Sequence, residues 1–209
     1  MQQIDPTVWN RRETAAFFGT LDFPFYNMSW RADVTNLHRA AKDGGLSFYF
    51  SMIYEVMHSL NGVEAFLYKL RGQSVVRHDA LSPSFTVPAA NEQFKIVSMD
   101  WDEREARDAF CVRAKALADA QTAQFPPDAQ EQRDDWAYIS CVPWVDFLSV
   151  TNEMNIDRDD SIPRVGWGKF VPEGDRLRMT VALQVNHRLI DGLHIGKFAQ
   201  LLQSRLDEA

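Results

Sequence analysis

The sequence has little cysteine and no long apolar run. Its 209 residues include two cysteines, Cys111 and Cys141, which are too few for a disulfide framework. No stretch approaches the roughly eighteen apolar residues that a membrane span needs. The first residues lack the apolar core of a signal peptide. These absences lead us to expect a reduced, cytoplasmic protein.

Clusters of positive charge are also missing. Lysine and arginine number 22 against 29 aspartates and glutamates, which gives a net charge of −7. Because nucleic acids and anionic membranes are bound through clustered basic residues, we expect neither as a partner. The sequence contains no P-loop and no glycine-rich dinucleotide turn. No pair of histidines or cysteines has metal-ligand spacing, so we expect no metal site.

What remains is an ordinary globular composition. Hydrophobic residues make up 45% and aromatic residues 12% of the chain. The length suits a single domain over residues 1–209. Helical and extended patterns alternate, which favours an α/β (α+β) fold with a mixed sheet packed against helices.

Local patterns predict several elements. Apolar spacing and an Asn61-Gly62 stop signal indicate a helix over residues 50–60. An alanine-rich, charged stretch predicts a long helix over residues 103–124. Residues 74–87 look extended around Ser82-Pro83, and Pro126-Pro127 place a loop at residues 125–135.

The clearest pattern lies near the C-terminus. Residues 177–185 alternate strictly between apolar and polar side chains, which predicts a strand with one buried face. His187 shares the parity of the apolar set, so we expect it to point inward. Asp191-Gly192 ends the strand, and the apolar spacing from Ile195 onward predicts a helix that Asp191 caps.

Residues 187–192 have the form H-x-x-x-D-G, which places chemistry at a strand-to-helix turn. Burial disfavours the imidazolium, and an uncharged imidazole is what a general base requires. Asp191 would fix the turn, either as a cap or by pairing with an arginine. From the local pattern alone, a buried structural role for His187 is an equally good interpretation. From the local pattern alone, Asp191 is likewise best interpreted as a helix cap.

Several motifs occur in an order that is more specific than this element. They are W-N-R-R-E at 9–13, S-C-V-P-W-V-D-F at 140–147, G-K-F-x3-G-D-R-L at 168–177 and Q-V-N-H-R-L-I-D-G-L-H-I-G at 184–196. Together they resemble the chloramphenicol acetyltransferase family over nearly the whole chain. H-x-x-x-D-G by itself also occurs in dihydrolipoamide acyltransferase cores and peptide-synthetase condensation domains.

The resemblance implies a CoA-dependent acyltransferase fold and a direct transfer of acetyl from acetyl-CoA to a hydroxyl in a ternary complex. His187 corresponds to the catalytic base and Ser140 to the serine that donates to the oxyanion. Asp191 and Arg11 correspond to a structural ion pair. The resemblance also implies a homotrimer in which His187 comes from one subunit and much of the acceptor pocket from its neighbour. If each residue is considered without the other motifs, the better interpretation of Ser140 is an ordinary strand serine and that of Arg11 is a surface charge.

Acceptor and cofactor contacts are implied with less support from the residues. The acceptor positions correspond to Phe17, Phe18, Tyr26, Thr86 and Phe94, although Phe17 and Phe18 also suit the core of a first helix. Lys169 and Arg188 are candidates for the CoA phosphates.

The sequence departs from the family at Gly166, where the family has a threonine that organises water. Val150 and Asn152 replace larger apolar residues, and Asn186 replaces a histidine. These departures put chloramphenicol itself in doubt as the acceptor. They also leave open a non-catalytic, trimeric ligand-binding or sequestering protein on the same scaffold. A dihydrolipoamide-type acyltransferase core is a further alternative, but that core normally follows a lipoyl domain and a flexible linker, and neither is present.

Overall fold

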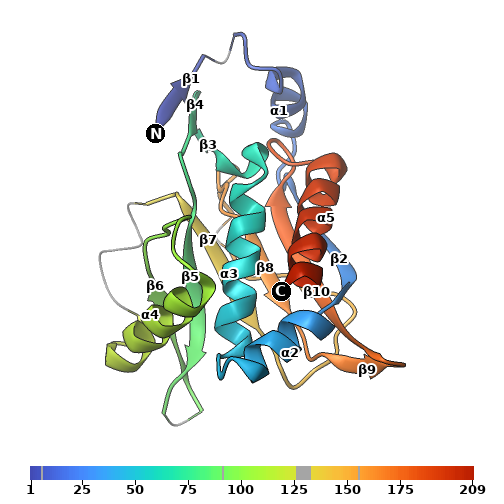
Figure 1. Cartoon of the computed structure of the whole chain (residues 1–209). Helices are drawn as coiled ribbons and strands as arrows, with labels where there is room; N and C mark the ends of the chain where they lie inside the picture. Colours follow the sequence, from blue (N-terminus) through green and yellow to red (C-terminus); the bar gives the residue numbers. More distant parts are fainter. Residues whose placement is uncertain (6, 91, 126–132, 155) are drawn as a thin grey trace.

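The computed structural model describes the whole chain except residues 6, 91, 126–132 and 155 (Figure 1). The strands are β1 (Gln2–Ile4), β2 (Phe25–Asp33), β3 (Tyr68–Arg71), β4 (Ser74–Arg77), β5 (Ser82–Pro88), β6 (Phe94–Ser98), β7 (Trp136–Cys141), β8 (Arg164–Trp167), β9 (Val171–Glu173) and β10 (Arg176–Asn186). The helices are α1 (Arg12–Phe18), α2 (Thr35–Asp43), α3 (Phe48–Asn61), the 3₁₀ helix η1 (Glu64–Leu67), α4 (Arg107–Ala120) and α5 (Gly192–Glu208).

A mixed, seven-stranded sheet organises the molecule. Its strands run in the order β2-β10-β8-β7-β5-β6, and β9 pairs with the outer part of β10. The β5–β7 and β7–β8 pairs are parallel, whereas β10 is antiparallel to both β2 and β8. A smaller sheet has the order β1-β4-β3. The α/β fold with a mixed sheet and packed helices is therefore confirmed.

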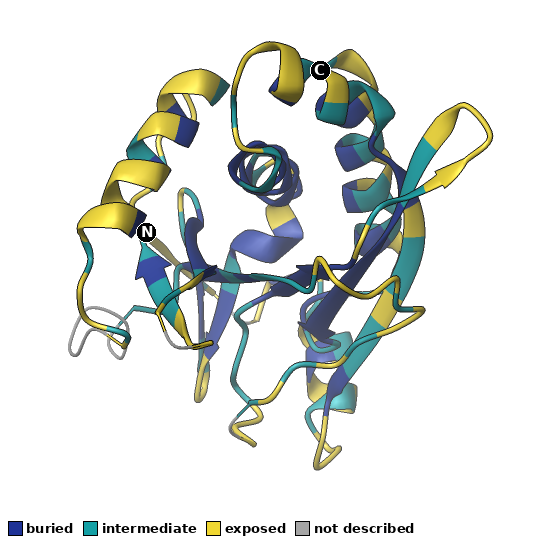
Figure 2. Cartoon of the chain, turned by 90° about the horizontal axis from the view of Figure 1, so that it is seen from below, coloured by how far each residue is buried: buried dark blue, intermediate teal, exposed yellow. Residues whose placement is uncertain are grey.

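Helix α3 lies at the centre of the layer that covers one face of the large sheet. It contacts α2, α4 and α5 on its sides and β5 and β7 beneath it. Figure 2 shows it dark blue between helices whose outer surfaces are exposed. Met52, Ile53, Val56 and Met57 are fully buried, as the apolar spacing predicts. The helix ends at Asn61 with Gly62 as its cap, so the predicted stop signal is confirmed.

Strand β10 shows one error in the sequence prediction. Its apolar set does join the helix-covered core, but both faces are buried from Met179 to Asn186. The polar face is covered by the segment between β7 and β8. Asn152 donates its backbone N–H to Gln184 Oε1 at 2.7 Å, and Asn186 donates its side-chain amide to the Asp160 carbonyl at 2.9 Å. Because these polar side chains are satisfied by backbone groups, alternation does not imply exposure here.

One predicted boundary is wrong, and one predicted extended segment is divided between two sheets. The helix predicted over residues 103–124 is shorter, because Asp102 forms a turn with the Arg104 N–H and the chain becomes extended at Gln121. The segment 74–87 contains two strands in different sheets, β4 and β5. Between them, the Asn61 side chain bonds both backbone groups of Leu81 and turns the chain from one sheet to the other.

The loop predicted at residues 125–135 lies mostly outside the described residues. Among the helices that the structure describes, none is long and apolar enough to cross a membrane.

Candidate active site

His187 directly follows β10, and the residue just before β2 fixes its backbone position. Its N–H donates to the Pro24 carbonyl at 2.7 Å. The imidazole stacks on Phe18 of α1 with ring centroids 3.8 Å apart and planes inclined by 13°. Tyr26 of β2 lies on it at 4.4 Å. The ring is therefore held between aromatic side chains from two elements.

The two ring nitrogens of His187 differ in their surroundings. Nδ1 is enclosed and has no hydrogen-bond partner among the described residues. Nε2 is not among the fully enclosed atoms, and no described residue bonds it. Nε2 is therefore the nitrogen that a reacting group reaches.

Asp191 supports the turn that follows His187. Its side chain accepts from the Leu193 N–H at 3.0 Å and caps α5, as predicted. Its other oxygen accepts from Arg11 Nη1 at 2.9 Å. Partial burial acts to raise the pKa of Asp191, but the bonds and charges of Arg11 and His194 outweigh it and lower the pKa overall. The pair joins α1 to the start of α5.

Ser140 lies on β7 and lines a cavity of about 1210 Å³. Its hydroxyl is 3.4 Å from Thr86 Oγ1 on the adjacent strand. Thr86, Phe94 and Lys169 line the same cavity, together with the aromatic side chains of Phe48, Tyr49, Phe85, Phe125, Tyr138, Trp144, Trp167 and Phe170. A cavity wall that combines aromatic side chains with polar and charged groups is typical of a small-molecule site.

Cys141 also lines this cavity. Burial raises the pKa of its thiol to about 12. At neutral pH the thiol is therefore protonated and a poor nucleophile.

The predicted site residues thus form two separate groups within one chain. The first group holds His187, Phe18 and Tyr26. The second group holds Ser140, Thr86, Phe94 and Lys169, which line the cavity, and no member of the first group lines it. Ser140 pairs across the sheet with Gly166, which pairs with Ala182, five residues before His187. Strand geometry then separates Ser140 from His187 by about 17 Å along the strands and about 10 Å across them. One chain does not bring both to the same reacting carbonyl.

The remaining candidates are placed as follows. Phe17 is 66% exposed and meets Phe18 edge-on, so it is not a core residue of α1. Phe94 on the edge strand β6 is 46% exposed. Lys169 is exposed beside the cavity. Arg188, a candidate for the CoA phosphates, instead pairs with Asp159 at 2.6 Å.

Sequence reasoning missed several polar groups around the site. Arg164 lines the cavity with its guanidinium 5.4 Å from the Tyr138 ring and is paired with Asp160 at 2.7 Å. Lys69 is fully buried behind it. Neither residue belongs to a motif or a spacing pattern, so no sequence signal marks either one. Within the described part of the chain, no cluster of acidic, histidine or cysteine side chains is suited to a metal ion.

Known proteins of one family are similar to this chain over nearly its whole length. The model of the chloramphenicol acetyltransferase family matches residues 1–203. Chloramphenicol acetyltransferase 2 of Escherichia coli is 28% identical over 213 aligned residues, covering 98% of this chain and 96% of that protein.

Solved structures share the fold. A chloramphenicol acetyltransferase matches with a TM-score of 0.89 at 24% identity, covering 98% of this chain and 99% of that one. A dihydrolipoamide acetyltransferase of Azotobacter vinelandii matches with a TM-score of 0.69 at 19% identity, covering 93% and 86% of the two chains. Because the family match spans nearly the whole sequence, the chain belongs to the chloramphenicol acetyltransferase family and is an acyltransferase.

Proposed function

We propose that the protein transfers acetyl from acetyl-CoA directly to a hydroxyl of chloramphenicol or a related small molecule, in an active site shared between subunits of a homotrimer. The observation that carries this proposal is the separation of His187 from Ser140 within one chain. A second copy would bring the His187 of one subunit to the Ser140 cavity of the next. Membership of the family supports acetyl-CoA as the donor and a trimer as the assembly.

In this proposal His187 is the general base. The acceptor hydroxyl gives its proton to Nε2 as its oxygen attacks the thioester carbonyl. The proton of the neutral imidazole then resides on Nδ1, the enclosed nitrogen. When the tetrahedral intermediate collapses, the carbon–sulfur bond breaks and the departing CoA thiolate takes the proton back from Nε2. Atoms and charge balance without an acyl-enzyme.

Ser140 is the proposed oxyanion donor. Its hydroxyl faces the cavity, and the negative oxygen of the tetrahedral intermediate would accept a hydrogen bond from it. Removing one donor of this kind typically lowers the rate by about a hundredfold to a thousandfold. Holding hydroxyl and thioester together in one cavity supplies a further part of the rate gain.

The acceptor would lie against the aromatic wall of the cavity. Thr86 and Phe94 are within that wall, whereas Phe18 and Tyr26 would approach it with the His187 of the neighbouring subunit. Phe17, exposed in one chain, would be covered by the same approach. In this proposal Lys169, which is exposed at the cavity, would meet a CoA phosphate.

The direct test is release of CoA thiol from acetyl-CoA with a panel of hydroxylated acceptors. We expect acceptor-dependent release by the wild type, and a loss of at least about a hundredfold in His187→Ala with the fold retained. Release that survives intact in His187→Ala would rule out the mechanism. Absence of release with every acceptor, with CoA still bound, would favour a binding protein on this scaffold.

A further inference from the structure

Both chain neighbours of His187 are bonded to one short segment, residues 158–160, which we call the clamp segment. The Asn186 side-chain amide donates to the Arg158 and Asp160 carbonyls, both at 2.9 Å. The Arg188 guanidinium donates to Asp159 Oδ1 at 2.6 Å. Asn186 Oδ1 also accepts from the Arg188 N–H at 3.0 Å, which closes the turn. The backbone that carries the imidazole is therefore anchored on both sides.

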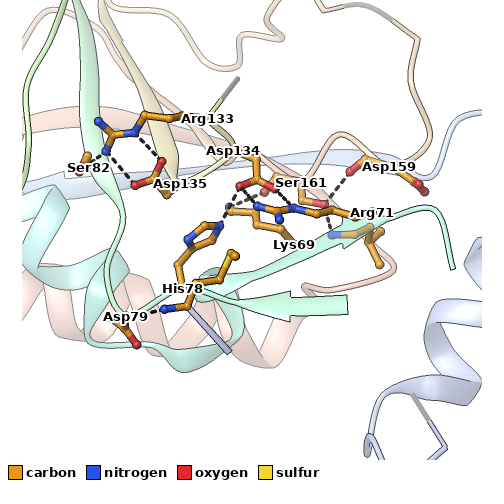
Figure 3. Close-up of polar contacts among 12 residues, drawn as sticks. Lys69, Arg71, His78, Asp79, Ser82, Arg133, Asp134, Asp135, Asp159 and Ser161 are labelled. Atoms are coloured by element: carbon orange, nitrogen blue, oxygen red, sulfur yellow. Dashed lines mark hydrogen bonds and ion pairs between the residues drawn. The ribbon is translucent and has the colours of Figure 1, made fainter. Parts of the chain in front are cut away.

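The clamp segment is itself fixed to the smaller sheet (Figure 3). Asp159 Oδ2 accepts from the Gly72 N–H at 2.6 Å. The next residue, Ser161, accepts from the Leu70 N–H at 3.0 Å, and its carbonyl accepts from Lys69 Nζ at 2.8 Å. These bonds connect the hairpin β3–β4 to the turn after β10 through a few residues.

The same segment reaches the ring that stacks on His187. Arg188 Nε donates to the Ala15 carbonyl of α1 at 3.3 Å, and Arg158 donates to the Gly19 carbonyl at the end of that helix. Phe18, which stacks on the imidazole, belongs to α1. Arg188 thus bridges the helix that carries the stacking ring and the clamp segment.

No hydrogen bond from the described residues orients the imidazole. Its Nδ1 has no partner among them, and no described residue bonds its Nε2. Its direction depends on the backbone of the turn and on the aromatic contacts. Arg188 and the clamp segment anchor that turn and the helix α1 that carries Phe18, whereas Pro24 and Tyr26 act from the side of β2.

We propose that Arg188 and Asp159 are positioning residues that aim the His187 imidazole at the acceptor. This inference rests on the proposed role of His187 as the base. The guanidinium of Arg188 is bonded to Asp159 and to the Ala15 carbonyl, so in this proposal it does not bind a phosphate. Reaction rates fall by about a hundredfold when reacting groups are misplaced by about 1 Å, so the pair has a measurable effect although it never touches the substrate.

The test compares Asp159→Asn and Arg188→Lys with a control variant. The asparagine in Asp159→Asn would still accept from the Gly72 N–H but lacks the charge, and a lysine cannot make all the contacts of the guanidinium. We expect kcat to fall about tenfold or more in each variant, with both KM values within about twofold of wild type. The double variant should lose little more than either single variant, because the two residues act as one pair.

The control is Glu105→Gln. Glu105, just before α4, pairs with Arg113 of that helix at 2.9 Å in a similarly half-buried setting, and neither residue contacts His187. We expect a comparable drop in melting temperature without a change in kcat. An unchanged kcat in both Asp159→Asn and Arg188→Lys would overturn the proposal. So would a rise in the KM for acetyl-CoA with kcat intact, which would make Arg188 a phosphate ligand.

A second measurement separates this proposal from the proposed function. The ring signals of His187 in carbon–proton NMR spectra report its orientation without turnover. We expect one sharp set in the wild type and in Glu105→Gln, and shifted or broadened signals in Asp159→Asn. Unaltered ring signals would overturn the positioning role. If the wild type acetylates no acceptor but Asp159→Asn still alters the His187 ring signals, the proposed function fails and the positioning role stands.

Discussion

Gly166 is a glycine that the packing of the fold does not require. It lies in β8 opposite Ser140 of β7 and Ala182 of β10. A Cβ at this position would meet the Val150 side chain at 3.7 Å and the Ser140 carbonyl at 3.8 Å, which are ordinary contacts. Space does not demand a glycine there. The missing hydroxyl therefore concerns the chemistry beside Ser140 and not the packing of the sheet.

Gly166→Ala should stabilise the protein. A glycine inside a strand costs about 0.5–1 kcal/mol relative to alanine, because its backbone is freer in the unfolded chain. We expect urea unfolding to show a gain of that order. Gly168→Ala is the contrast, since its Cβ would meet the Val145 carbonyl at 2.6 Å and the Phe147 ring at 3.1 Å. A loss of stability in Gly166→Ala, or equal tolerance at both glycines, would contradict this account.

At the scale of elements, the sequence predicts well where one side of a helix or strand meets the core. The helices α3 and α5 and the strand β10 all have this periodicity, and the pattern locates all three. The prediction over residues 103–124 extends too far because composition says nothing about the Asp102 turn. The change of sheet between β4 and β5 depends on the Asn61 side chain, which comes from another element. Such tertiary partners leave no local pattern.

Lys69 on β3 is an element-scale feature that no pattern reveals. Its ammonium is fully buried and donates to the Phe66 carbonyl at 3.3 Å. It also donates to the Ser161 carbonyl at 2.8 Å (Figure 3). Burial lowers its pKa to about 7. The carboxylates of Asp134, Asp160 and Asp135 act in the opposite direction, whereas the nearby Arg164 lowers the pKa further. The lysine thus connects β3 to Ser161, the residue after the clamp segment, and the stability that this burial allows depends on pH.

The sign of that dependence can be tested with Lys69→Met. In the unfolded chain the lysine titrates near 10.5, so between pH 7 and 10.5 the unfolded state holds a proton that the folded state has released. Stability from this group therefore rises with pH in that window and is flat below about pH 7. The slope is at most about 1.4 kcal/mol per pH unit.

We expect the wild type to gain free energy of unfolding relative to Lys69→Met from pH 7 to pH 10. The exposed Lys115→Met on α4 should run parallel to the wild type. Parallel curves for Lys69→Met as well would show that the buried lysine stays charged.

At the scale of the whole molecule, the sequence predicts candidate site residues but not their arrangement. The H-x-x-x-D-G element and the ordered motifs point to His187, Ser140, Asp191 and Arg11 as candidates. That His187 and Ser140 stand far apart in one chain follows from the register of β7, β8 and β10, which joins residues distant in sequence. Register depends on the completed sheet, so local patterns do not contain it.

The central claim is that each active site takes His187 from one subunit and Ser140 from its neighbour. Co-expression of His187→Ala with Ser140→Ala chains tests it most directly. Each variant alone should be nearly inactive. In mixed trimers formed at random, a site is intact when one subunit supplies His187 (one half) and the next supplies Ser140 (one half), so about a quarter of wild-type activity should return. Mixed trimers that recover no activity beyond the two variants would contradict the shared site.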